Sequence, residues 1–237
     1  MHKINGIWAV CCAVVMVACS ETKFVPDGQY LLDKVVVTTD GKYPDVNISN
    51  MKNYVRQKGN SRWFSAVKIP LTTYSLAGRD TSKWINRTLQ QFGEPPVIFD
   101  TLKAQLSCNE LQQALVNQGY LRASVNMNTT TNGKKLKAHY ILHPGEVYRI
   151  GNMRYVIKDE NIAELLCMND TAQWGLHIGD KFNTDNLNQE RTRISNLLTD
   201  NGYFLFNKEF ISYTADTIAN SKDISLTFIL EKYSNRS

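Results

Sequence analysis

The segment LQQALVNQGYL at Leu111–Leu121 recurs as ISNLLTDNGYF at Ile194–Phe204, 83 residues further along the chain. In both copies apolar residues recur at positions i, i+3 and i+4, which is the spacing of one face of an α-helix, and Gly-Tyr follows. Glycine directly after a helix can adopt the left-handed backbone conformation that ends it. The repeat therefore predicts two long helices that stop at Gly119 and Gly202, with positive φ at both glycines.

The repeat extends back to the start of each helix. Phe99-Asp-Thr101 stands at the same offset from Phe182-Asn-Thr184. Asp and Asn are good N-caps, because a side-chain oxygen accepts an otherwise unpaired backbone N–H. Ser107-x-x-Glu110 also resembles a capping box, but the repeat favours the earlier start. We predict helices over 101–118 and 184–201.

Two strands are predicted after each helix. Three segments alternate apolar and polar or small residues with the period of a strand, at 121–130, 136–142 and 224–230. A fourth strand is predicted near 204–213. Asn132-Gly133 predicts a tight hairpin turn between the first pair. A longer turn through Ala219–Lys222 is predicted between the second pair.

Each copy also begins with a strand. Tyr30-x-Leu-x-x-Val-x-Val37 resembles Tyr148-x-Ile-x-x-Met-x-Tyr155 at an offset of 118 residues. The two-residue skip in the alternation predicts a β-bulge, which Gly151-Asn152 fits in the second copy. Shorter helices are predicted before the long ones, near Ile48–Arg56 and Asn161–Leu166. Both copies are therefore predicted to be β-α-α-β-β units, and the fold class is α+β.

The two offsets, 118 and 83, differ by 35 residues, which the first unit carries as an insertion near 57–95. Within it, Lys83–Phe92 has the pattern of an added helix, and Gly93-Glu-Pro-Pro96 ends that helix. Trp63-Phe64 and Trp84-Ile85 fit anchors at a membrane surface, where Trp is enriched. They also fit packing of the insertion onto the first domain, which is the interpretation we favour.

A loosely basic zone overlaps the start of the insertion. It could face anionic lipid headgroups or, as we favour, be a solvated surface. Its members are Lys52, Arg56, Lys58, Arg62 and Lys68.

Residues 1–18 have the pattern of a signal peptide: a basic start, an uncharged apolar run of 12 residues over Gly6–Val17, and a small residue, Ala18, before Cys19. The run is shorter than the roughly 20 residues of a bilayer span. Ala18-Cys19 resembles a bacterial lipobox, in which the Cys carries a diacylglyceryl group, although Met16 replaces the usual Leu. We predict lipid attachment at Cys19. The alternative is an ordinary signal peptide or a short anchor with a chance Cys.

Composition excludes several classes. The 237 residues are 43% hydrophobic and 10% aromatic, which argues against disorder. A net charge of +5 without a basic block makes nucleic acid an unexpected partner. Besides Cys19 the processed chain retains only Cys108 and Cys167, too few for a disulfide scaffold. We expect two separate, partly buried thiols.

No catalytic or metal-binding pattern is present. His139 and His143 lie on a predicted strand, which would hold them about 13 Å apart, too far for one metal ion. Gly-x-Ser-x-Gly, Walker A and His-Glu-x-x-His motifs are absent. Asp159-Glu160 is expected to be a solvated turn. We therefore expect no enzyme activity, no cofactor and no metal.

Two tandem β-α-α-β-β units, each with Gly-Tyr between the long helix and the hairpin, resemble POTRA domains. The second unit is the closer match, through Gly179–Asn183, Glu190-Arg191 and Gly202–Phe204. The insertion, with Gly78–Arg87 and Gly93–Ile98, is similar to the N-terminal region of BamA/TamA-like outer-membrane proteins of Bacteroidetes.

The resemblance implies a domain plan. A signal peptide (1–18) and a linker (19–28) precede a first POTRA-like domain (29–145, with the insertion near 57–95) and a second (146–233). The family continues into further periplasmic sequence and a membrane β-barrel, whereas this sequence stops at Ser237. We interpret the sequence as a member truncated before the barrel, or as a barrel-less relative, and no barrel function is carried over.

The resemblance also implies a function. The chain would be a periplasmic module of outer-membrane protein assembly or translocation, lipid-anchored on the periplasmic side of the outer membrane. Its partners would be that membrane and unfolded outer-membrane protein clients or assembly partners. The alternative is a barrel-less lipoprotein adaptor that binds a protein or a glycan.

Strand addition is the expected mode of binding, because a three-stranded sheet has a free edge that an extended client can join. The resemblance implies that the second strand of each unit, with the groove beside the long helix, receives the client. Alternation does not decide which of its N–H groups point outward. The candidate residues are Val125, Asn126, Met127 and Asn128 in the first unit, and Phe210 and Ile211 in the second.

Overall fold

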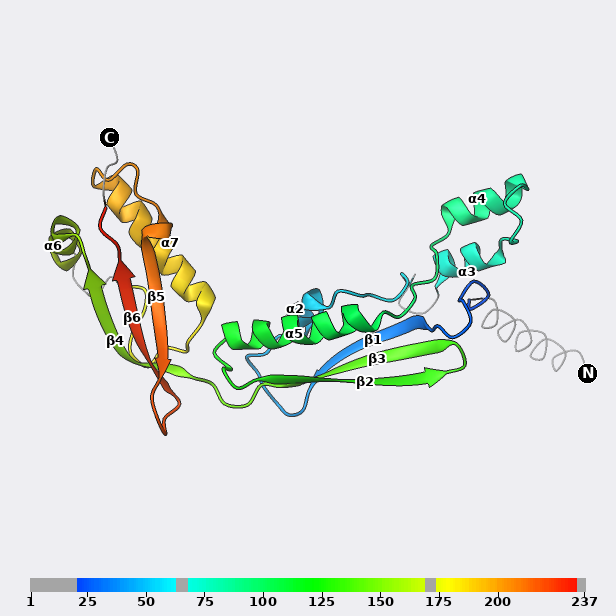
Figure 1. Cartoon of the computed structure of the whole chain (residues 1–237), viewed down its shortest axis with the longest axis horizontal. Helices are drawn as coiled ribbons and strands as arrows, with labels where there is room; N and C mark the ends of the chain where they lie inside the picture. Colours follow the sequence, from blue (N-terminus) through cyan, green and yellow to red (C-terminus); the bar gives the residue numbers. More distant parts are fainter. Residues whose placement is uncertain (1–20, 63–67, 169–173, 234–237) are drawn as a thin grey trace, which may run out of the picture. The chain divides into compact units, whose positions relative to one another are not determined.

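The computed structural model describes residues 21–62, 68–168 and 174–233 (Figure 1). Contacts divide the chain into two compact units. The first unit comprises Met1–Leu111 with Val125–His143, and the second comprises Gln112–Ser124 with Pro144–Ser237. Within the described ranges, no helix combines the length and the apolar character that a membrane crossing needs.

The first unit holds a mixed three-stranded sheet. Its strands are β1 (Leu31–Thr39), β2 (Ser124–Asn132) and β3 (Lys135–His143), in the order β1-β3-β2. β1 runs parallel to β3. The helix α5 (Thr101–Asn117) and the shorter α2 (Ile48–Met51) lie on the same face of this sheet (Figure 1).

Alternation along β3 builds the core of the first unit. Leu136, Ala138, Tyr140 and Leu142 are buried, whereas the residues between them are partly or fully exposed. A strand presents alternate residues to opposite faces, so only one face of β3 is apolar. The helix side of the sheet is therefore the core side, and the opposite face is polar.

The second unit repeats this arrangement. Its sheet has the order β4-β6-β5, with β4 parallel and β5 antiparallel to β6. The strands are β4 (Arg149–Ile157), β5 (Ile211–Thr217) and β6 (Asp223–Leu230). Ile162 of α6 (Glu160–Met168) and Ile194 of α7 (Thr184–Asp200) join Phe228 of β6 in one buried cluster. The predicted α+β class with two β-α-α-β-β units is confirmed.

Both first strands carry the predicted bulge. The register between β1 and β3 shifts between Leu32 and Lys34, and that between β4 and β6 shifts between Ile150 and Asn152. A Cβ on Gly151 would lie 2.5 Å from the Cβ of Asp223, so the second bulge needs a glycine.

Both long helices end as the repeat predicts. Gly119 has φ +89° and Gly202 has φ +97°. In each case the glycine and the following tyrosine donate their backbone N–H groups back to the last turn, with Tyr120 reaching Leu115 at 3.1 Å and Tyr203 reaching Leu198 at 3.0 Å. This bond pattern is the Schellman motif.

The helix starts are also confirmed. The Asp100 side chain accepts the N–H groups of Leu102 and Lys103 at 2.9 and 3.1 Å, and the Asn183 side chain accepts that of Asp185 at 2.8 Å. The alternative start at Ser107 is not used.

The insertion holds two helices rather than one. The predicted added helix is α4 (Trp84–Phe92). A helix that the sequence did not indicate, α3 (Ile69–Leu76), precedes it and buries Leu71 against Val25 and Leu31. Pro70 stands in the first turn of α3, where proline is tolerated because its missing N–H would be unpaired anyway.

The preference for packing Trp84 and Ile85 onto the first domain is wrong. Trp84 is 71% exposed and Ile85 is 50% exposed. Trp63 and Phe64 lie outside the described residues, as does Cys19.

The predicted bounds of two strands need correction. β2 begins at Ser124 rather than at residue 121. β5 begins at Ile211 rather than at residue 204, because Asn207 caps a 3₁₀ turn, η3 (Lys208–Phe210), by accepting the Glu209 N–H at 2.8 Å. That cap takes the backbone out of the extended conformation before the strand starts.

Candidate functional site

The second strand of each unit lies at an open sheet edge. β2 and β5 are each paired on one side only, with β3 and β6, and no other strand of the described residues borders them. An unpaired edge presents a row of backbone N–H and C=O groups to solvent. Both units therefore offer a template for an added strand at the predicted place.

The opposite edge of each sheet is partly closed by the chain itself. Ile98 forms an antiparallel bridge with Leu31 of β1, and Lys181 forms one with Arg149 of β4. These bridges stand at equivalent places of the internal repeat. In each unit the segment that leads into the long helix covers the start of the first strand, and only the edge of the second strand is left wholly open.

Hydrogen bonds hold these covering segments in place. In the first unit, Leu32 donates its N–H to Val97 at 2.8 Å, and the Gln57 side chain donates to the Ile98 carbonyl at 2.7 Å. In the second unit, Ile150 donates its N–H to Asp180 at 2.8 Å. The difference between the two edges is thus built into the fold of both units.

The candidate residues of the first unit lie on β2. Val125 and Met127 are half-buried, and Asn126 and Asn128 are exposed. All residues from Asn128 to the end of the strand are exposed, so this half of β2 covers no core. The Asn126 amide lies 3.3 Å from His143 Nε2 on the neighbouring strand. The Asn126 side chain therefore already has a polar contact within the sheet.

The candidate residues of the second unit stand at the entry to β5. Phe210 is the last residue of η3, so it precedes the strand, and its ring stacks on Phe206 with 5.2 Å between centroids. Ile211 opens the strand, but its side chain is fully buried and its N–H donates to Lys208. Neither residue offers a free donor at the edge, which instead starts at Tyr213.

Two backbone bonds fix which groups of β5 point outward. Glu231 donates its N–H to Phe210, and Ile218 donates its N–H to Asp223. In an antiparallel ladder, hydrogen-bonded pairs alternate with non-hydrogen-bonded pairs. The backbone N–H and C=O groups of the even-numbered residues of β5 therefore point toward β6. Those of the odd-numbered residues point toward the open edge. The outward-facing N–H groups that lack a partner among the described residues belong to Tyr213, Ala215 and Thr217.

A groove of about 330 Å³ lies beside this edge, between α7 and β5. The helix contributes Thr184, Leu187, Asn188 and Arg191, and the strand contributes Ile211, Ser212 and Tyr213. Arg191 donates to the Lys208 carbonyl at 2.9 and 3.1 Å, which ties α7 to the turn before β5 and fixes the spacing of the two walls. The family resemblance implies a groove beside the long helix next to the second strand, and the second unit has one at this place.

Buried polar groups lie under the groove. The Tyr213 hydroxyl is buried and has no hydrogen-bond partner among the described residues. Burial, with the nearby charge of Glu190, raises the pKa of Tyr213 well above its usual value. Glu190 is itself buried and forms an ion pair with Arg193 at 2.7 Å. Tyr213 therefore stays a neutral phenol at any physiological pH.

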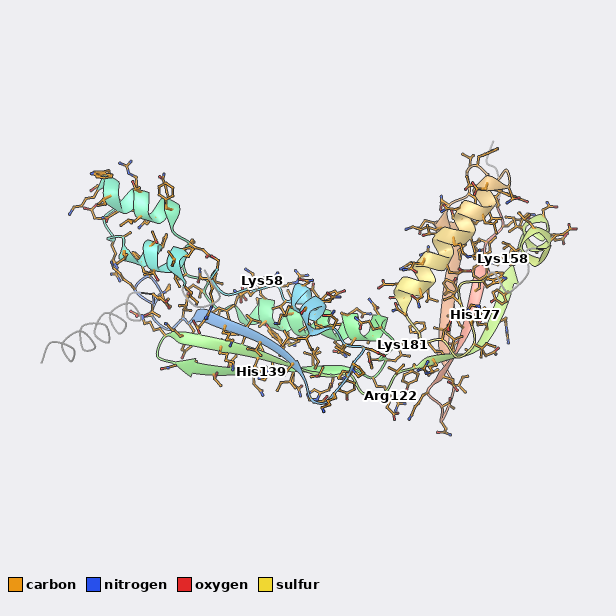
Figure 2. All side chains as sticks on the ribbon, turned by 180° about the vertical axis from the view of Figure 1, so that it is seen from behind. Lys58, Arg122, His139, Lys158, His177 and Lys181 are labelled. Carbon is orange, nitrogen blue, oxygen red and sulfur yellow. The ribbon has the colours of Figure 1, made fainter. Side chains whose placement is uncertain are left out.

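A second groove, of about 540 Å³, lies beside β1 in the first unit and is basic. Among the described residues that line this groove, Asp33 is the only acid. Burial would raise the pKa of Asp33, but the hydrogen bond from Lys68 and the charges of Lys68 and Arg62 outweigh burial and lower it. The remaining cations, which form no ion pair within the described part of the chain, are Lys34, Lys52 and Lys58. Figure 2 shows Lys58 on the helix side of the sheet and His139 on the opposite side.

His139, His143 and Cys108 lie in surroundings that do not indicate a chemical role. His139 Nε2 lies 2.8 Å from Thr38 Oγ1, and His143 Nδ1 lies 2.7 Å from Asp40 Oδ2. Cys108 is free and half-buried, and burial raises the pKa of its thiol. Over the described ranges, no three His, Cys, Asp or Glu residues are grouped so that they could hold a metal ion.

No protein-family profile and no curated protein matches the sequence. The structure is similar to the POTRA3–5 region of BamA from Haemophilus influenzae, with a TM-score of 0.44 and 14% identity over 88% of this chain and 69% of that one. It is also similar to POTRA1–3 of the periplasmic domain of Omp85 from Anabaena (TM-score 0.38, 11% identity, 86% and 62% covered). A third similar structure is CdiB from Escherichia coli (TM-score 0.30, 9% identity), of which the chain spans 29%.

Proposed function

We propose that the chain is a periplasmic POTRA module of a BamA/TamA-like machinery for outer-membrane protein assembly or translocation, and that it holds extended polypeptides by strand addition. One observation carries this proposal. Both units cover the start of their first strand's edge with their own chain and leave the edge of the second strand open along its length. Backbone hydrogen bonds at such an edge carry little sequence information, which suits many unfolded clients.

The second unit supports the proposal in more detail. An extended peptide that pairs with Tyr213, Ala215 and Thr217 would present alternate side chains to the two faces of the sheet. On the helix side it would meet the groove between α7 and β5. The exposed polar side chains of Ser212 and Thr214 on the same strand leave the edge accessible. In strand addition, backbone hydrogen bonds supply the affinity, and the groove would supply the selectivity.

The proposal includes a lipid at Cys19 and a location on the periplasmic side of the outer membrane. The sequence pattern around Cys19 supports it. The chain is already part of the folded unit at Lys23, whose ammonium donates to the Ala77 carbonyl at 2.7 Å. A lipid four residues upstream would therefore hold the folded first unit close to the membrane.

The experiment uses the processed chain with a photocrosslinking residue at the exposed position Ser212, and a urea-unfolded outer-membrane β-barrel protein as the client. Ala215→Pro removes an outward N–H, whereas Ala215→Val keeps it and serves as the matched control. We expect crosslinking through β5 in the valine variant and its loss in the proline variant, with both folded by circular dichroism. Equal crosslinking in the two variants would show that the client does not use this edge.

The basic groove beside β1 favours a second candidate function, an adaptor that binds an acidic protein or glycan through side chains. Lys34, Lys52 and Lys58 converge on it without ion pairs among the described residues. Under this alternative, Lys52→Gln with Lys58→Gln would abolish partner binding, and Ala215→Pro would leave it unchanged. The strand-addition proposal expects the reverse pattern.

A further inference from the structure

The helix α4 in the insertion turns its apolar face to solvent. At 100° per residue, Trp84, Ile85, Thr88 and Phe92 fall within one sector of the helix. Trp84 is 71% exposed, Ile85 is 50% exposed and Phe92 is 81% exposed. A surface helix of a globular domain normally buries such a face against the core. Here the face has no covering element in the described part of the unit.

The opposite side of α4 is the one that packs. Asn86 is buried, donates its amide to the Asp80 carbonyl at 2.6 Å and accepts the Gly78 N–H at 2.9 Å. At the end of the helix, a Cβ on Gly93 would lie 2.5 Å from the backbone of Tyr74 in α3. A polar side chain therefore holds α4 to the loop that follows α3, and a close backbone approach holds it to α3 itself. Figure 1 shows α3 between α4 and the sheet of the first unit.

The charges around this face are basic. Between Ile69 and Gly93 the cations are Arg79, Lys83 and Arg87, and the only acid is Asp80. All three cations are exposed. Asp80 is occupied locally, since its carboxylate accepts the hydroxyl and the N–H of Ser82 at 2.6 and 3.0 Å. An apolar aromatic face with a basic border matches an anionic lipid surface.

The start of the folded chain lies against the same helix pair. Lys23 donates to the Ala77 carbonyl at 2.7 Å, directly after α3. The Phe24 ring meets that of Tyr74 edge-on, with 5.3 Å between centroids. Cys19 is four residues before Lys23, and four residues of chain span at most about 14 Å. The predicted lipid attachment point is thus restricted to the neighbourhood of α3 and α4.

We propose that the apolar face of α4 lies in the interfacial layer of an anionic bilayer and acts as a second membrane contact beside the lipid on Cys19. The position beside the lipid rests on the lipid anchor of the proposed function; the binding of the face itself does not. A diacylglyceryl group has two acyl chains, which by themselves anchor a protein stably, so a second contact at α4 would add a fixed orientation to that anchor. The helix would also set which side of the first unit faces the membrane.

The first test uses the processed chain with Cys19→Ser, so that no lipid is present. Its flotation is measured with vesicles of phosphatidylethanolamine and phosphatidylglycerol. Trp84→Ser with Phe92→Ser should weaken vesicle binding by about tenfold or more, because two interfacial aromatic groups are lost. Phe204→Ser with Leu205→Ser is the matched control, since these side chains are 78% and 71% exposed in the second unit. The control should bind as the parent does.

Two outcomes would overturn the proposal. The first is failure of the parent chain to float with anionic vesicles. The second is an equal loss of binding in both double variants, which would indicate a general effect of exposed apolar groups. All four changed residues are largely exposed, so circular dichroism should show folded proteins throughout. Retention of the α4 variant on vesicles, with loss of a protein partner instead, would assign this face to that partner.

A second measurement locates the helix in the bilayer. Brominated lipids quench tryptophan at membrane depth, and Trp84→Phe keeps an aromatic group on the face while it removes the reporter. We expect vesicle binding to persist in this variant and the bromine quenching to fall. Unchanged quenching would mean that another tryptophan meets the lipid, and the proposal would be wrong. Neither readout involves β5 or a client, so failure here is separate from failure of strand addition.

Discussion

Glu231 donates its backbone N–H to the carbonyl of Phe210 at 2.9 Å, one residue before β5 begins. This bond fixes the alternation of the whole edge strand, because hydrogen-bonded and non-hydrogen-bonded pairs alternate along an antiparallel ladder. The backbone N–H of Thr214 therefore points toward β6, and that of Ala215 points toward the open side. Two adjacent residues that both have exposed side chains thus differ in the direction of their N–H groups.

That difference predicts unequal costs for proline. Thr214→Pro should lower the free energy of unfolding by about 1–3 kcal/mol more than Ala215→Pro, because it leaves a ladder carbonyl without its donor. Urea unfolding of the two variants, compared with Thr214→Val and Ala215→Val, measures this. Equal destabilisation by the two prolines would mean that the assigned alternation is wrong.

The two helix-ending glycines should respond differently to alanine. Both have positive φ, so Gly202→Ala should cost about 1–2 kcal/mol from backbone strain alone. A Cβ there meets nothing within 4 Å, whereas a Cβ on Gly119 would lie 2.4 Å from the carbonyl oxygen of Phe182. Gly119→Ala should therefore be the more destabilising change.

Thermal and urea unfolding of both alanine variants test this order. Gly119 and Gly202 both fall in the second compact unit. A smaller loss at Gly119 than at Gly202 would contradict the close approach of Phe182.

Lipid attachment is tested at its proposed residue. Cys19→Ala should block processing at Ala18-Cys19 and abolish incorporation of labelled fatty acid, because no thiol remains to carry the lipid. Size on a denaturing gel and fractionation of cells measure the two effects. Ser20→Ala is the control and should be processed normally. A Cys19→Ala protein that matures to the same size would exclude the lipobox.

Much of the fold is predictable because it depends on local signals. The apolar spacing of each long helix, its N-cap at Asp100 or Asn183 and its terminal glycine are all contained within about one repeat of sequence. The bulge at Gly151 is visible as a break in the strand alternation. These features need no knowledge of tertiary contacts.

The rest depends on contacts that no local pattern records. β5 could not be bounded from sequence, because Phe204 and Leu205 continue an apolar run and yet are 78% and 71% exposed. The Asn207 cap sets a 3₁₀ turn before the strand, and β5 can begin only after that turn. The outward face of α4 was also unpredictable, since an amphipathic pattern does not tell whether the apolar side meets a core or the surroundings. The groove between α7 and β5 follows from the family resemblance and not from a local pattern, because it joins two segments that are far apart in sequence.

The pair formed by Asp33 and Lys68 carries the last prediction. Lys68 Nζ lies 2.7 Å from Asp33 Oδ1, and the lysine side chain is only 3% exposed. This bond ties the bulge of β1 to the residue before α3, and so to the insertion. Removal of one partner leaves a buried charge uncompensated. Asp33→Asn should therefore cost about 3 kcal/mol, whereas Asp33→Asn with Lys68→Met should recover most of that loss.

The same pair predicts a pH dependence with a defined sign. The pKa of Asp33 is lowered in the folded protein, because the hydrogen bond and charge of Lys68 outweigh burial. The unfolded chain then binds a proton more readily than the folded chain, so the stabilisation is fully present above the unfolded pKa and is lost as the pH falls through the folded one. Urea unfolding between neutral and strongly acidic pH should show the parent losing stability in the acid range more steeply than the double variant. Parallel pH profiles for the two proteins would show that this pair contributes nothing to acid sensitivity.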